Sequence, residues 1–190
     1  MESGLKKAAI IFVFAALLLG IFPAALAAEG EAKIIKEFSS ASSIEGIEGL
    51  VTDRENTRFY DVSARFDVTA GSGKEIILKN LNLDLSGQSY LNQWIYLPKA
   101  QDSATINILL GPNGASSRQF YYIQTVPANW EGWKLVSLPL DGFVRRNDHG
   151  IKLTDVPEDL ATIHEMLYAV NSYLNEVGAT AWSEDSYFSI

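Results

Sequence analysis

From Arg58 onward, short runs in which apolar and polar residues alternate are separated by turn residues. The run Val62–Val68 places an apolar side chain at every second position, which is typical of a strand with one buried face. The same alternation predicts strands over 81–85, 91–97 and 104–110. Aromatic and β-branched runs predict further strands over 118–124, 133–138, 166–170 and 186–190. One helical turn is expected over 157–164, with Asp155 as its cap.

These elements define the expected fold and its boundaries. About eight short strands with Gly, Pro and Asn turns and almost no helix predict an all-β protein, a two-sheet antiparallel β-sandwich, over residues 51–190. Residues 28–50 precede it as a polar segment rich in Ser and Gly, in which Ala32–Phe38 is a possible extra strand. That strand either pairs within its own chain or fills an open sheet edge of the next copy.

Residues 1–27 have the pattern of a signal peptide for export. Lys6 and Lys7 supply the positive region, an uncharged run follows over 8–25, and Ala25-Leu26-Ala27 places small residues at the cleavage site. We therefore expect a mature protein that begins at Ala28 and is secreted or held at the cell surface. The alternative is an uncleaved membrane anchor, because the uncharged run is nearly long enough to span a bilayer.

The chain is acidic and contains no cysteine. Its 15 Lys and Arg residues and 23 Asp and Glu residues give a formal net charge of −8. This charge disfavours nucleic acid and anionic membranes as partners, because phosphates are repelled; membrane contact is expected only through an uncleaved signal segment. The absence of cysteine excludes disulfides, thiol catalysis and thiolate metal sites. An exported domain without disulfides favours a bacterial or archaeal origin.

Several stretches resemble the jelly-roll carbohydrate-binding modules and galactose-binding-like domains. They are Leu91–Pro98, which contains Leu-x-x-Trp-Ile-Tyr, then Ala104–Leu110, Trp133–Phe143, and Glu184–Ile190, a short strand after an acidic pair. The resemblance implies a jelly-roll sandwich and glycan binding. A signal segment followed by one sandwich, without a catalytic module, also resembles the subunits of some prokaryotic surface filaments and tubules.

Aromatic side chains on one strand face suggest a platform for sugars, because the C–H faces of pyranose rings stack on aromatic rings. Because successive side chains of a strand point to opposite faces, the alternation within 91–97 places the aromatic side chains on one face and the aliphatic ones on the other. The expected ligand face, in which polar side chains bond sugar hydroxyls, comprises Asn92, Trp94, Tyr96, Asn107, Gln119, Tyr121 and Trp130. The alternative is that these rings fill the core, as large aromatics usually do. Trp133 is expected in the core for the same reason.

Carboxylates near both ends of the sandwich suggest a structural calcium ion, whose expected ligands are Glu45, Glu48, Asp53 and Asp185. A hard cation takes several oxygens, and two chain ends that meet in a sandwich can supply them together with backbone carbonyls. Related jelly rolls commonly hold such an ion, and that resemblance implies Asp185 most directly. The alternative is a set of scattered, solvated carboxylates, because the chain has no compact calcium-loop motif.

The sequence shows no catalytic motif, so we expect a protein that is not an enzyme. His149 lies in a charged loop and His164 in the expected helical turn, and neither has a second histidine at metal-binding spacing. Two functions remain. One is a secreted, non-catalytic module that binds glycans. The other is a structural subunit that assembles with copies of itself, through β-strand exchange, into an extracellular filament or tubule.

Overall fold

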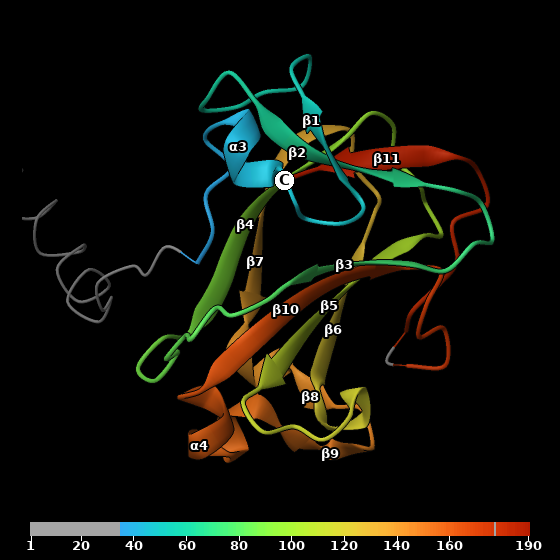
Figure 1. Ribbon diagram of the computed structural model, residues 1–190. Coiled ribbons are helices and arrows are strands. Elements are labelled where there is room, and N and C mark those ends of the chain that lie inside the picture. The colour runs from blue at the N-terminus through green and yellow to red at the C-terminus, as the bar shows by residue number, and fades with distance from the viewer. Residues whose placement is uncertain (1–34, 177) are drawn as a thin grey trace, which may run out of the picture. The chain divides into compact units, whose positions relative to one another are not determined.

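Two antiparallel sheets face each other in the part of the chain that the computed structural model describes, residues 35–176 and 178–190 (Figure 1). These residues belong to one compact unit that spans 34–190. The expected signal peptide and the cleavage site before Ala28 lie outside the described residues. No helix in the described part of the chain is long and apolar enough to cross a membrane.

The five-stranded sheet has the order β1 (Leu50–Asp53), β2 (Ser63–Val68), β11 (Ser186–Ser189), β4 (Tyr90–Leu97), β7 (Gly132–Pro139). The six-stranded sheet has the order β3 (Lys74–Leu78), β10 (Ile163–Val170), β5 (Thr105–Pro112), β6 (Tyr122–Pro127), β8 (Val144–Arg145), β9 (Asp148–Lys152). Short helical turns connect them: α3 (Ala41–Ile44), η1 (Arg118–Phe120), η2 (Leu140–Gly142), η3 (Leu153–Asp155) and α4 (Pro157–Leu160). This arrangement is the two-sheet β-sandwich that the strand pattern predicts.

The hydrophobic core lies between the two sheets. Phe66 of β2 and Phe188 of β11 are fully buried, and their ring centroids lie 5.0 Å apart. Ile95 of β4 and Ile108 of β5 are fully buried in the same cluster. Each of these strands therefore turns its apolar side chains inward, which leaves alternate positions of the five-stranded sheet on its outer face.

The alternation of apolar and polar residues predicts the wrong structure in the connection after β3. The expected strand over 81–85 is wrong, because Leu83 forms only an isolated bridge with Ile163. Asn80 and Asn82 adopt positive φ angles of 58° and 49°, which interrupt an extended strand. The strand in this part of the chain is instead β3, whose run Lys-Glu-Ile-Ile-Leu lacks strict alternation.

Three other expected elements differ in the structure. Residues 118–124 begin as the helical turn η1, and the strand starts only at Tyr122. The possible strand over 32–38 does not form within Ile35–Phe38; its first residues, 32–34, lie outside the described part of the chain. The expected helical turn over 157–164 forms only over α4 (Pro157–Leu160), and its cap is Val156, not Asp155. Ile163 already begins β10, so His164 lies in a strand and not in the helical turn.

Candidate functional site

The outer face of the five-stranded sheet carries the aromatic side chains that strand parity predicts. Leu91 and Ile95 of β4 point into the core and are buried. Asn92, Trp94 and Tyr96 therefore lie on the opposite face, where Asn92 is exposed and both rings are partly exposed. The prediction that these three side chains share a face outside the core is confirmed.

Three rings on this face form a continuous row, which we call the aromatic ladder: Tyr187 of β11, Tyr96 of β4 and Trp133 of β7. Tyr187 and Tyr96 are stacked, with ring centroids 6.3 Å apart and planes inclined by 26°. The centroids of Tyr96 and Trp133 lie 5.6 Å apart, because the register of β4 and β7 pairs these two residues directly. Each ring is partly exposed. The aromatic ladder therefore presents ring surface to solvent across three adjacent strands.

Polar groups lie beside the aromatic ladder. The guanidinium of Arg65 lies 3.9 Å from the ring centroid of Tyr187. Asn92 and Ser137 are exposed partners on the same face, four residues, or about 13 Å, from Tyr96 and Trp133 along their strands. Burial, and then the neighbouring Tyr187, raise the pKa of Tyr96, so its hydroxyl is protonated at neutral pH. This face thus combines ring surfaces with groups that donate and accept hydrogen bonds.

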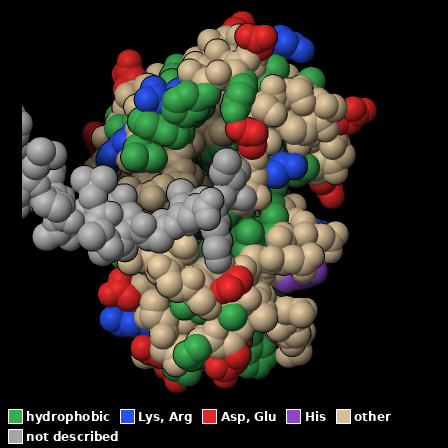
Figure 2. Space-filling view, turned by 90° about the vertical axis from the view of Figure 1, so that its left-hand side faces the viewer, with side chains coloured by type: hydrophobic (Ala, Val, Ile, Leu, Met, Phe, Trp, Pro, Cys, Tyr) green, Lys and Arg blue, Asp and Glu red, His purple; other side chains and the backbone are tan. Residues whose placement is uncertain are grey.

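The loop between β1 and β2 covers one side of Trp94. The guanidinium of Arg58 lies 3.5 Å from the Trp94 ring centroid, and the Phe59 ring meets Trp94 edge-on at 6.0 Å. Phe59 is 66% exposed. Further exposed hydrophobic side chains of this loop and face are Val51, Tyr60, Tyr90 and Leu135. Figure 2 shows hydrophobic side chains beside Lys and Arg side chains in the upper part of the molecule, at the height of β1 and β2.

The structure divides the expected ligand face between the two sheets. Asn107 lies in β5 of the six-stranded sheet, is fully buried, and donates from Nδ2 to the carbonyl of Ser172 at 2.7 Å. Tyr121, just before β6, is buried and donates its hydroxyl to Glu165 at 2.7 Å. Burial and then this hydrogen bond raise the pKa of Tyr121 to about 12. Gln119 is exposed on η1, next to β6. The expectation that these residues join the face of Trp94 is therefore wrong.

The two neighbouring tryptophans exchange their expected places. Trp130 is partly buried, packs against the core, and donates from Nε1 to the carbonyl of Gly132 at 3.1 Å. Trp133 instead lies outside the core, because the inward positions of β7 are Val136 and Leu138. The expected core position of Trp133 is a wrong prediction, and this ring becomes part of the aromatic ladder.

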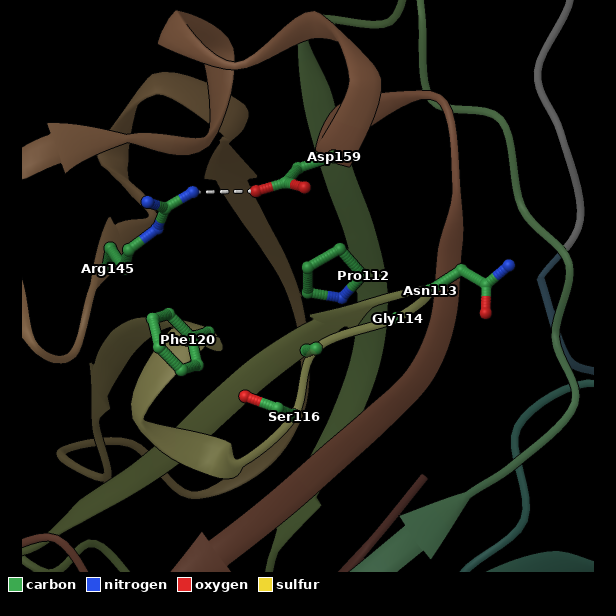
Figure 3. Close-up of a pocket in the computed structure, with 8 residues that line it drawn as sticks. Pro112, Asn113, Gly114, Ser116, Phe120, Arg145 and Asp159 are labelled. Atoms are coloured by element: carbon green, nitrogen blue, oxygen red, sulfur yellow. Dashed lines mark hydrogen bonds and ion pairs between the residues drawn. The ribbon is translucent and has the colours of Figure 1, made fainter.

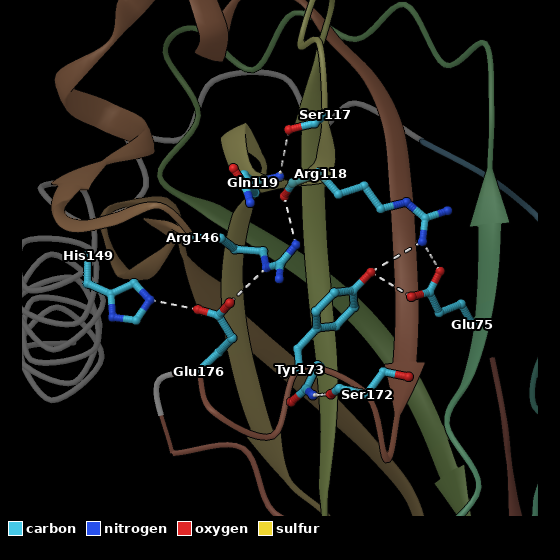
Figure 4. A network of polar contacts seen from close by, with 10 residues as sticks. Glu75, Ser117, Arg118, Gln119, Arg146, His149, Ser172, Tyr173 and Glu176 are labelled. Carbon is cyan, nitrogen blue, oxygen red and sulfur yellow. Dashed lines mark hydrogen bonds and ion pairs between the residues drawn. The ribbon is translucent and has the colours of Figure 1, made fainter.

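The outer face of the six-stranded sheet carries a polar network (Figure 4), whose main members are Glu75, Arg118, Arg146, His149, Tyr173 and Glu176. Tyr173 donates its hydroxyl to Glu75 at 2.5 Å, and Arg146 lies 4.1 Å from the Tyr173 ring centroid. Arg146 also pairs with Glu176 at 3.0 Å. A second apolar cluster that includes the buried Leu109 lies on this side of the sheet. Because the charged groups bind one another, this face offers fewer uncommitted groups to a ligand than the aromatic ladder does.

Asp53, an expected metal ligand, is buried and holds the end of β1. Its carboxylate accepts hydrogen bonds from the backbone N–H groups of Glu55 and Asn56 and from the side chains of Asn56 and Ser189, at 2.9–3.1 Å. Burial acts to raise the pKa of Asp53, but the hydrogen bonds outweigh it and hold the pKa below its usual range. Asp53 therefore links β1 to β11 as a carboxylate.

The other expected calcium ligands are exposed. Asp185 accepts a hydrogen bond from the backbone N–H of Ala70 at 2.9 Å, and Glu45 and Glu48 flank the turn after α3. Within residues 35–176 and 178–190, no group of three or more His, Asp and Glu side chains is arranged to hold a metal ion. Calcium binding stays a prediction.

Comparison with known proteins establishes the fold. The chain is similar to the family 11 carbohydrate-binding module from Clostridium thermocellum, solved in complex with a β-1,3-1,4-mixed-linked tetrasaccharide. The TM-score is 0.51 at 14% sequence identity, over 76% of this chain and 80% of that chain. A carbohydrate-binding module of family 28, specific for non-crystalline cellulose, gives a TM-score of 0.48 at 14% identity, over 85% and 92% of the two chains. No protein-family model and no curated protein matches the sequence. The domain therefore has the jelly-roll fold of carbohydrate-binding modules.

Two members of the aromatic ladder, Trp133 and Tyr187, were not assigned to the ligand face from sequence. A signal for Trp133 is present, since Val136 and Leu138 are apolar at alternate positions and place residue 133 on the other face. Parity in 186–190 likewise places Tyr187 opposite Phe188. No local signal shows that both strands flank β4 or in what register.

Proposed function

We propose that residues 28–190 form an exported, non-catalytic domain that binds a glycan chain along the aromatic ladder. The observation that carries the proposal is the row of partly exposed rings across β11, β4 and β7. The shared fold with a carbohydrate-binding module solved with a tetrasaccharide supports the same class of ligand. The binding groups are aromatic faces together with the guanidinium of Arg65, whose charge is paired with Asp67. This combination suits a neutral polysaccharide.

The geometry of the aromatic ladder suits an oligosaccharide segment. Three adjacent strands span two interstrand spacings, or about 10 Å, so the rings extend beyond a single sugar unit. The apolar faces of the sugars would stack on Tyr96 and Trp133, while the guanidinium of Arg65 beside Tyr187 would donate to hydroxyls at the side. The net charge of −8 favours neutral over anionic chains.

The test is affinity electrophoresis in gels that contain mixed-linked β-glucan, xylan, mannan or no polysaccharide. Wild-type protein is expected to be retarded by at least one of these polymers. Tyr96→Ala should weaken that retardation more than Trp94→Ala, because Arg58 already lies against the Trp94 ring. Tyr90→Ala is the control, since this 58% exposed tyrosine lies about 20 Å from Tyr96 along the same strand.

Two outcomes would contradict the proposal, one for the position of the site and one for glycan binding itself. If Tyr96→Ala is folded and still retarded like the wild type, the aromatic ladder does not bind the glycan. If no polymer from a broad glycan array binds the wild type, the domain is not a glycan-binding module.

The second candidate function is a structural subunit that assembles outside the cell. A specific observation favours it: Phe59 and Tyr90 are 66% and 58% exposed, and Leu135 of the edge strand β7 is 46% exposed. Exposed hydrophobic side chains and an edge strand of eight residues are features through which copies associate. The part of 28–50 from Phe38 onward packs against its own chain, so under this proposal residues 28–34 of one copy contact the sheet of the next.

The structure limits how this second function is tested. Ile44 is 2% exposed in the core, and Phe38 packs against it, so removal of all of 28–50 would damage the fold itself. Two milder variants, a deletion of 28–34 and the substitution Leu135→Lys, avoid that damage. Electron microscopy and sedimentation of the secreted protein are expected to show polymers that these changes abolish; assemblies that persist in both variants would contradict the proposal.

A further inference from the structure

A pocket of about 250 Å³ lies at the end of the six-stranded sheet, away from the aromatic ladder (Figure 3). The turn that follows β5, the short helices η1 and α4, and strand β8 contribute its lining, which is Pro112, Asn113, Gly114, Ala115, Ser116, Phe120, Arg145 and Asp159. Three separate segments of the chain, 112–120, β8 and α4, thus converge on one cavity.

The polar wall of the pocket is an ion pair that also contacts the hydroxyl of Tyr122. Arg145 Nη2 lies 2.8 Å from Asp159 Oδ2 and donates to the hydroxyl of Tyr122 at 2.6 Å. That hydroxyl donates to the same carboxylate oxygen at 2.6 Å. About a fifth of each charged side chain is exposed to solvent. The pair can therefore bond a ligand in the pocket through its exposed atoms.

An aromatic ring forms the other side. Phe120 is 38% exposed, and Figure 3 shows its ring beside the same space as the Arg145 guanidinium. The hydroxyl of Ser116 points toward that space, whereas the amide of Asn113 points away from it. The cavity therefore combines one apolar ring with a carboxylate, a guanidinium and a hydroxyl.

We infer that this pocket binds a single neutral sugar residue, either a free monosaccharide or the end of a chain. The ring of Phe120 offers a stacking face for the sugar C–H groups, while Asp159, Arg145 and Ser116 accept from and donate to its hydroxyls. Because the carboxylate and the guanidinium compensate each other, the pocket favours neither an anion nor a cation. Its volume is below the roughly 300 Å³ at which pockets for drug-sized ligands begin, so it admits one ring. This second site extends the proposed glycan binding and does not use the aromatic ladder.

The test uses the full mature chain and saturation-transfer NMR with glucose, galactose, mannose and N-acetylglucosamine as separate probes. At least one monosaccharide should bind the wild type, and Phe120→Ala should raise its dissociation constant roughly two- to twelvefold. Ser116→Ala provides a second variant in an exposed turn. Leu174→Ala is the matched control, because this exposed hydrophobic residue (44%) lies outside the pocket, and it should leave monosaccharide binding unchanged.

The outcomes distinguish this pocket from the aromatic ladder. Monosaccharide binding that Phe120→Ala removes and Tyr96→Ala retains supports the pocket, whatever the polysaccharide gels show. If a polysaccharide binds the wild type but none of the four monosaccharides does, the proposed function stands and the pocket proposal is overturned. Monosaccharide binding that persists at wild-type strength in Phe120→Ala also overturns it.

Discussion

Trp133 and Trp182 offer a direct comparison between an aromatic residue of the ladder and one of the core. Trp182 is 1% exposed, and its Nε1 donates to the carbonyl of Thr105 at 2.9 Å. Trp182→Ala removes a whole buried side chain and leaves that carbonyl without its partner, so the free energy of unfolding should fall by about 3–5 kcal/mol. Trp133 is partly exposed on the outer face and loses chiefly its contact with Tyr96, so Trp133→Ala should lower stability by only about 1 kcal/mol.

The effects on glycan binding should have the opposite order, with a larger loss of affinity in Trp133→Ala than in Trp182→Ala. A lost stacking contact is worth about 0.5–1.5 kcal/mol, so folded Trp133→Ala should bind the retained polysaccharide roughly two- to twelvefold more weakly. Urea unfolding of both variants measures stability, and affinity electrophoresis at 25 °C, where the variants are folded, measures binding.

Two results would refute this reasoning. A loss of stability in Trp133→Ala as large as that in Trp182→Ala would mean that the Trp133 ring is a core element, as large aromatics in sandwiches usually are. A folded Trp133→Ala with unchanged affinity would mean that the aromatic ladder is not the binding surface.

Three further predictions concern stability and processing. Because the pKa of Asp53 is lower in the folded state, its carboxylate stabilises the fold above the unfolded pKa of about 3.9, and this contribution is lost as the pH falls through the folded pKa. Asp53→Asn should therefore lower the free energy of unfolding at pH 7 by about 1–3 kcal/mol, with a smaller difference below pH 4, whereas the exposed Asp61→Asn should change little. Calcium should raise the melting temperature in proportion to the logarithm of its concentration, and Asp185→Ala should remove most of the rise; identical melting curves in chelator and millimolar calcium would contradict this. N-terminal sequencing of native protein should begin at Ala28, and a start at Met1 would show that the signal segment is retained.

The sequence by itself determined which side chains share a face within one strand. The alternation in β4 places Trp94 and Tyr96 away from Ile95, because successive side chains of a strand point to opposite sides. The same local rule applies in β5, where Asn107 does lie opposite Ile108. Parity and turn residues act over a few positions, so they can be read from a short stretch of chain.

Only the tertiary structure decided which strands lie side by side. Asn107 follows Tyr96 closely in the sequence, yet β4 and β5 belong to different sheets. Tyr187 lies far along the chain and nevertheless stacks on Tyr96, because β11 inserts between β2 and β4. Strand order and register follow from the packing of the whole core, whose contacts join distant segments. A binding surface that crosses several strands therefore depends on pairings that no local pattern contains.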